Sequence, residues 1–134
     1  MIQIEAAPEE IYDIELEHSL LEANAKLADK NRTLLNRHGV TAIDFMGAIG
    51  SGKTTLITRL VEKLKDRLGM AVFNGDATTS TDADQIARHG IPVVQIATIN
   101  GCHLDANLVG KACQKIDLDN VKLIFVENIG NLIC

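Results

Sequence analysis

The sequence lacks the features that would place this protein in a membrane, on nucleic acid or outside the cell. No apolar run approaches the ~20 residues of a membrane helix, and the N-terminus has no basic-then-apolar signal pattern. The net charge of -5 argues against nucleic-acid binding, which usually requires a basic face. We therefore expect no membrane association, no nucleic-acid partner and a cytoplasmic location.

Cysteine is scarce and irregularly placed. Cys102, Cys113 and Cys134 are an odd number without the spacing of a secreted disulfide framework, so a reducing compartment is the default. A length of 134 residues suffices for one domain. Because the sequence stops directly after an apolar run, at Cys134, we expect a truncated domain.

The first part of the chain has the apolar spacing of a helix. From about Glu9 to His38 the apolar residues recur at intervals of seven, and Gly39 is a typical helix stop. Two interpretations remain open, a helical arm packed on its own domain or a coiled-coil seam between two chains. In either case we expect an N-terminal helical extension over residues 1–39 and a second unit over 40–134.

Strands and helices alternate after residue 39. The patterns predict strands over 40–46, 70–73, 92–97 and 122–126, and helices over 53–68, 81–89 and 103–115. This alternation is typical of an α/β fold, a parallel sheet with helices on both faces, whose ligands bind outside the carboxyl ends of the strands. Four candidate residues lie at or shortly after such ends: Gly47, Asp76, Cys102 and Glu127.

The details of two helices are also predicted. The helix over 53–68 is expected to bury Leu56, Leu60, Val61, Leu64 and Leu68, which have the spacing of one helical face. The helix over 81–89 is expected to have Thr81 as its N-cap.

A glycine-rich loop between a predicted strand and a predicted helix is the most specific motif. Residues 47–54 match G-x-x-x-x-G-K-[ST], in which the glycines let consecutive backbone N–H groups face phosphate oxygens. We expect Lys53 to contact the β- and γ-phosphates and Thr54 to hold Mg²⁺. The predicted nucleotide-binding residues are Gly47, Ala48, Ile49, Gly50, Ser51, Gly52, Lys53, Thr54, Thr55 and Gly130.

Two carboxylates are candidates for the magnesium side of this P-loop site. A nucleotide triphosphatase of this type needs an acid near Mg²⁺ at the end of another strand. Asp76 follows the second strand after residue 39, and Glu127 follows the fourth. We predict Lys53, Asp76 and Glu127 as catalytic residues and Thr54, Asp76 and Glu127 as the magnesium environment. Solvated carboxylates at the strand ends are the alternative.

A second group of reactive side chains begins at Cys102. Cys102 lies about where a helix is predicted to begin, a position that lowers the pKa of a thiol and favours the metal-binding thiolate. His103 is its neighbour, and Cys134 follows the fourth strand. Three ligands do not complete a tetrahedral metal site, but a two-fold dimer would double the number of available ligands. A Cys/His nucleophile pair is the alternative, and Cys113 is expected to be a core residue.

With these motifs assembled, the sequence resembles the HypB family of hydrogenase nickel-incorporation GTPases. The resemblance implies that residues 40–134 are the N-terminal portion of a P-loop GTPase domain. It rests on residues 44–54, 75–76, 102–106 and 127–134, and it extends to 28–32 and 38–40 in the N-terminal helical region.

This resemblance also implies an activity and partners. Family members hydrolyse GTP to GDP, dimerise on binding GTP, and deliver Ni²⁺ to the [NiFe]-hydrogenase large-subunit precursor with a partner metallochaperone. Their Ni²⁺ or Zn²⁺ site, at the dimer interface, is formed by the residues matching Cys102, His103 and Cys134. The family's guanine-reading motif, Asn-Lys-x-Asp, lies beyond Cys134, so specificity for GTP over ATP rests on the resemblance alone.

Three other functions share some of these motifs. A urease-accessory nickel GTPase has a proline between its Cys and His, whereas Cys102 and His103 are adjacent. A P-loop small-molecule kinase would show acceptor-dependent turnover and would not need Cys102. A non-hydrolytic metal-binding module would bind Zn²⁺ or Ni²⁺ through the same three residues without turnover.

Overall fold

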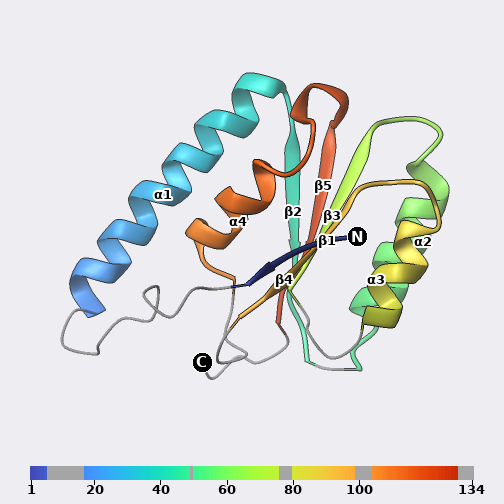
Figure 1. Ribbon diagram of the computed structural model, residues 1–134, viewed down its shortest axis with the longest axis horizontal. Coiled ribbons are helices and arrows are strands. Elements are labelled where there is room, and N and C mark those ends of the chain that lie inside the picture. The colour runs from blue at the N-terminus through green and yellow to red at the C-terminus, as the bar shows by residue number, and fades with distance from the viewer. Residues whose placement is uncertain (6–16, 49, 76–79, 99–103, 130–134) are drawn as a thin grey trace.

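The protein is described by a computed structural model over residues 1–5, 17–48, 50–75, 80–98 and 104–129. Its strands form one parallel sheet in the order β1-β4-β3-β5-β2 (Figure 1). The strands are β1 Ile2–Glu5, β2 Thr41–Phe45, β3 Met70–Asn74, β4 Val93–Ala97 and β5 Leu123–Glu127. The helices are α1 Glu17–His38, α2 Lys53–Leu64, α3 Ser80–Ala87 and α4 Ala106–Cys113, with a short 3-10 turn at Leu118–Asn120.

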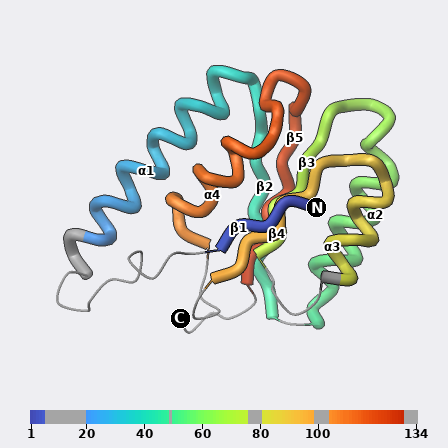
Figure 2. The backbone as a smooth tube through the Cα atoms, in the orientation of Figure 1, coloured from blue at the N-terminus to red at the C-terminus, as the bar shows by residue number. Residues whose placement is uncertain are grey.

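Two of the described helices cover each face of this sheet, which confirms the expected fold. Helices α1 and α4 lie side by side over one face, and α2 and α3 lie over the other (Figure 2). Phe73 and Ile124 are in the core on the α1 and α4 side, whereas Ile57 and Phe125 are in the core on the opposite side. Because apolar side chains cover both faces, β3 is buried along its whole length.

Helix α1 packs on its own domain, as the arm interpretation requires. Leu34 and Leu35 lie against the core that α4 shares, whereas Leu21 in the first half of the helix is 65% exposed. The residues predicted to be helical before Glu17 lie outside the described part of the chain. Packing within the chain therefore accounts for the apolar stripe in the C-terminal part of α1.

Strand β1 was not predicted. It pairs in parallel with β4, placing Ile2 opposite Val94 and Ile4 opposite Ile96, and Ile4 is buried. A strand of 4 residues offers too few alternations for a reliable pattern. Residues 2–5 thus belong to the sheet rather than to a helical extension, while the division of 1–39 from 40–134 stays a prediction.

Two predicted helix details are wrong. Leu56 is 50% exposed, and Ile57 is fully buried instead. The other predicted positions hold, because Val61 is buried and Leu60, Leu64 and Leu68 pack against the same core. Helix α3 begins at Ser80, which places Thr81 in its first turn rather than at the cap.

A glycine between α2 and β3 is required by close backbone packing. A Cβ on Gly69 would lie 1.8 Å from the carbonyl oxygen of Asn120. The Gly69 carbonyl also accepts hydrogen bonds from the backbone N–H groups of Lys122 and Leu123, which restrict any adjustment. We expect Gly69→Ala to lower the free energy of unfolding by about 3 kcal/mol in urea denaturation.

The matched control for this prediction is Gly90→Ala. A Cβ there would meet open space, and only the positive φ of 81° opposes it, so the loss should be about 1 kcal/mol. Equal losses for the two variants would contradict the steric account of Gly69.

Candidate nucleotide and metal site

The loop between β2 and α2 has the backbone conformation that phosphate binding needs. Gly50 and Gly52 have φ values of 78° and 95°, a region that residues with a Cβ rarely adopt. Gly52 is also the N-cap of α2, so no side chain caps this helix, and its first turn carries no acid. The N–H groups of that turn are thus available to an external anion.

Lys53 brings a positive charge into this loop. Its side chain is buried, and Nζ donates hydrogen bonds to the carbonyl oxygens of Gly47 at 2.7 Å and Ala48 at 3.3 Å. The ammonium group therefore lies against the loop rather than in solvent. A cation beside a helix N-terminus is suited to a polyphosphate.

Thr54 and Glu127 meet across the carboxyl edge of the sheet. Glu127 is the last residue of β5 and lies opposite Phe45 in the β2–β5 pairing. Its side chain is only 1% exposed, and its Oε1 accepts a hydrogen bond of 2.5 Å from the Thr54 hydroxyl. Two of the three predicted magnesium residues are thus adjacent, and a hydroxyl with a buried carboxylate offers the hard oxygen atoms that Mg²⁺ prefers.

Asn128 is a buried residue of this edge that the sequence reasoning did not single out. Its amide donates to the carboxylate of Asp44, and its Oδ1 accepts from the backbone N–H of Leu104. The sequence offers one signal for Asn128, which is its position as a polar residue directly after an apolar strand. No periodicity, however, shows which groups it would contact.

Several predicted site residues lie outside the described part of the chain, so their roles stay predictions. They are Ile49, Asp76, Cys102, His103, Gly130 and Cys134. Among the residues that are described, no three His, Cys, Asp or Glu side chains gather closely enough to hold a metal ion.

Helix α4 begins later than predicted, which removes the argument that a helix start favours a metal-binding thiolate at Cys102. Asp105 is the N-cap, and its side chain accepts a 2.8 Å hydrogen bond from the N–H of Leu108. Aspartate is a favoured capping residue, so the helix begins at Ala106 instead of His103. Cys102 precedes Ala106 by four residues in the sequence, so it does not stand at the start of this helix, where the prediction had placed it.

Cys113 is a core residue, as predicted. It is 2% exposed, and burial raises the pKa of its thiol from 9.0 to about 11, an effect that a backbone hydrogen bond partly offsets. Such a thiol is neutral at physiological pH and is a poor metal ligand.

This raised pKa predicts a stability change at high pH. The folded state holds the Cys113 proton more tightly than the unfolded state, so the stabilisation is complete below pH 9 and is lost as the pH rises towards 11. The free energy of unfolding should fall by about 1.4 kcal/mol per pH unit in this window. Cys113→Ala should lack this component, and identical pH profiles for the two proteins would contradict the assignment.

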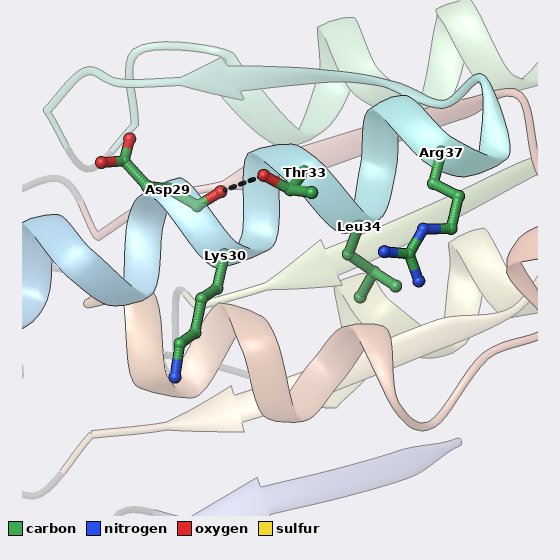
Figure 3. A pocket seen from close by; sticks show the side chains of 5 residues that line it. All are labelled: Asp29, Lys30, Thr33, Leu34 and Arg37. Atoms are coloured by element: carbon green, nitrogen blue, oxygen red, sulfur yellow. Dashed lines mark hydrogen bonds between the residues drawn. The ribbon is translucent and has the colours of Figure 1, made fainter.

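Two described hollows lie on the α1 side of the sheet, away from the phosphate loop. One, of about 410 Å³, has a described lining that consists of α1 residues, and Figure 3 shows the Thr33 hydroxyl bound to the Asp29 carbonyl of the same helix. The other, of about 690 Å³, lies between α1, β2 and α4, and its wall includes Asp44 and Leu104. Solvent in the second hollow therefore reaches Asp44, whose carboxylate accepts hydrogen bonds from Asn128.

No described helix combines the length and apolar character needed to cross a membrane.

Comparison with known families identifies the domain type. The sequence pattern of the family described as "CobW/HypB/UreG, nucleotide-binding domain" matches residues 41–134. The match covers the phosphate loop, the Thr54–Glu127 pair and the predicted metal ligands.

Curated relatives extend the similarity to the N-terminal part. A probable hydrogenase maturation factor HypB of Methanocaldococcus jannaschii is 52% identical over 121 residues, which are 90% of this chain and 55% of that protein. The hydrogenase maturation factor HypB of Escherichia coli is 39% identical over 90% of this chain and 42% of its own length. The chain thus spans about half the length of the curated relatives it matches.

Two solved structures have the same fold. The crystal structure of the hydrogenase maturation factor HypB from Archaeoglobus fulgidus aligns with a TM-score of 0.77 at 39% identity, covering 84% of this chain and 55% of that one. HypB from Helicobacter pylori, crystallised in complex with nickel, aligns with a TM-score of 0.74 at 32% identity, covering 84% and 53%.

Proposed function

The chain belongs to the CobW/HypB/UreG family of nucleotide-binding domains, and we propose that it hydrolyses GTP to control the delivery of nickel to a [NiFe]-hydrogenase precursor. The observation that carries the nucleotide half of this proposal is the hydrogen bond between Thr54 and the buried carboxylate of Glu127, beside a glycine loop that encloses Lys53. The metal half is supported by the names of the relatives, which are hydrogenase maturation factors, and by the nickel complex of one similar structure.

The chain's own residues divide the work of the nucleotide site. The loop amides and Lys53 bind and orient the β- and γ-phosphates, while Thr54 and Glu127, with Asp76, would hold Mg²⁺. When bound, Mg²⁺ neutralises charge that develops on the phosphate oxygens. Since Glu127 is buried, its negative charge is little screened by water and contributes strongly to this environment.

The metal cargo is assigned to Cys102, His103 and Cys134. Thiolate and imidazole groups suit both Ni²⁺ and Zn²⁺, and three ligands from each of two chains could complete a shared site. In this proposal GTP binding drives dimerisation and hydrolysis changes the geometry of the ligands, so that nickel passes to the precursor with the help of a partner metallochaperone. The cytoplasmic location remains a prediction.

The experiment compares metal binding by the purified chain and two cysteine variants. Calorimetric titration with Ni²⁺ and with Zn²⁺ should give a tight site that Cys102→Ala weakens by about 100-fold or more. Cys113→Ala is the matched control, because the buried Cys113 is not part of the proposed site and its loss should leave the affinity unchanged. If Cys102→Ala binds both metals as the wild type does, the metal half of the proposal is wrong.

Hydrolysis of GTP and ATP by the same preparations tests the nucleotide half. We expect Mg²⁺-dependent release of phosphate from GTP without any acceptor molecule. Turnover that needs a small-molecule acceptor would favour a kinase instead, and binding of metal without turnover would favour a non-hydrolytic module.

A further inference from the structure

One buried side chain, Asn128, joins two strands to the segment before α4. It is 6% exposed, and its Nδ2 donates to both carboxylate oxygens of Asp44 on β2, at 3.3 and 3.2 Å. Its Oδ1 accepts from the backbone N–H groups of Leu104 at 3.2 Å and Ile129 at 2.9 Å. Its own N–H donates to the Phe45 carbonyl at 3.1 Å. Few side chains could replace it, because the same group must both donate and accept.

Asn128 directly follows the residue that contacts the phosphate-loop helix. Glu127 accepts the hydroxyl hydrogen bond of Thr54, and the Glu127 carbonyl accepts from the N–H of Gly75 at 2.8 Å. A shift of Glu127 when its contact with Thr54 changes would therefore move Asn128 through the backbone that they share. Buried hydrogen-bonded groups of this kind can carry energetic coupling between sites.

Leu104 is the residue on which these contacts converge. Its N–H is bound by Asn128, and its side chain lies against Gly75, where an added Cβ would be only 2.7 Å from Leu104 Cδ1. In the sequence Leu104 follows His103 immediately, so it is the described residue next to the proposed metal ligands Cys102 and His103.

The chain beyond Leu104 is fixed to α1 and α4. The Ala106 N–H donates to Asn24 Oδ1 at 2.8 Å, and its carbonyl accepts from Asn31 Nδ2 at 2.7 Å. Asp105 caps α4. With that end fixed to the helices, two described contacts join the nucleotide edge to Leu104: the hydrogen bond from its N–H to Asn128, and the packing of its side chain against Gly75. Only the first is a hydrogen bond that a single side-chain substitution removes.

We propose that Asn128 is a positioning residue that transmits the state of the nucleotide site to Leu104, the residue that directly follows the proposed metal ligands Cys102 and His103 in the sequence. The metal part of this statement rests on the proposed function. The mechanical part, from Thr54 through Glu127 and Asn128 to the Leu104 amide, does not, so the two can fail separately.

Amide-resolved hydrogen exchange of Leu104 tests the mechanical part directly. The 134-residue chain is measured by NMR with Mg²⁺ and either GDP or a non-hydrolysable GTP analogue. We expect the exchange rate of the Leu104 amide to differ by about fivefold or more between the two nucleotides, and Asn128→Ala to abolish the difference. Asn120→Ala is the matched control, because the Asn120 amide bonds to Asp117 before β5, at the opposite edge of the sheet.

Exchanging the amide of Asn128 and the carboxylate of Asp44 distinguishes a positioning role of Asn128 from a simple loss of packing. Asn128→Asp keeps an acceptor for Leu104 but sets one carboxylate against that of Asp44, which should weaken the nucleotide dependence. The double variant Asp44→Asn with Asn128→Asp again places a donor opposite an acceptor and should restore the dependence. This arm also keeps the proposal testable if Asn128→Ala does not fold.

The proposal is overturned if exchange at Leu104 ignores the nucleotide in the wild type, or if Asn128→Ala keeps the wild-type difference. Nickel titration of the same samples distinguishes the two failures. If the exchange difference depends on Asn128 but Cys102→Ala does not affect Ni²⁺ binding, the coupling stands and the assigned metal site is wrong. If Ni²⁺ binds through Cys102 but Leu104 does not respond, the metal site stands and Asn128 has no coupling role.

Discussion

Replacement of Lys53 by alanine is expected to reduce GTP hydrolysis by about 100-fold or more and to weaken nucleotide binding. The Lys53 ammonium is buried against the loop carbonyls of Gly47 and Ala48, so its removal deletes the one charge described inside this loop. The backbone amides alone would then face the phosphates. Single-turnover hydrolysis and titration with a fluorescent GDP analogue measure the two losses.

Lys63→Ala is the matched control, since Lys63 lies in the last turn of the same helix and is exposed. Nickel affinity without nucleotide should be unchanged in Lys53→Ala, because the proposed metal ligands lie elsewhere in the chain. A Lys53→Ala protein that hydrolyses GTP at the wild-type rate would show that the loop is not the catalytic phosphate site. Equal loss of hydrolysis and nickel binding would contradict the separation of the two roles.

Replacement of Glu127 by glutamine should lower the hydrolysis rate by about 100-fold while leaving the shape of the site intact. Glutamine can still accept the Thr54 hydrogen bond, but it lacks the negative charge that supports Mg²⁺ in this buried position. The variant should therefore need a higher Mg²⁺ concentration for half-maximal turnover. Steady-state rates measured against Mg²⁺ concentration test this result.

Glu62→Gln provides the comparison for this charge removal. Glu62 is an exposed residue of α2 whose contacts with Arg59 and His89 are both 3.7 Å long, so its neutralisation should change neither turnover nor stability by much. An unchanged magnesium dependence in Glu127→Gln would mean that this carboxylate does not support the metal.

Much of the fold could be predicted because its signals are local. The glycine loop, the apolar strands and the alternation of strands and helices appear within short windows of sequence, and these gave the parallel sheet with helices on both faces. The loop motif also predicted that Thr54 and an acid on a distant strand would share one edge. The Thr54–Glu127 hydrogen bond confirms that adjacency.

Other features depended on contacts between distant segments and could not be predicted. Strand β1 exists because Ile2 and Ile4 pair with β4, about ninety residues further along the chain. The start of α4 was decided by capping at Asp105, not by apolar spacing. Asn128 is informative only once Asp44 and Leu104 are known to lie on either side of it. Sequence periodicity describes faces of elements but not which polar groups meet between them.

The most direct test of nucleotide-controlled nickel delivery is a Ni²⁺ titration of the purified chain in GDP and then in a non-hydrolysable GTP analogue, with molecular mass followed by light scattering. We predict that the analogue produces a dimer and changes the nickel affinity by about fivefold or more, and that Cys102→Ala abolishes the tight site in both states. Nickel binding that is identical in the two nucleotides, with no change in mass, would contradict this mechanism.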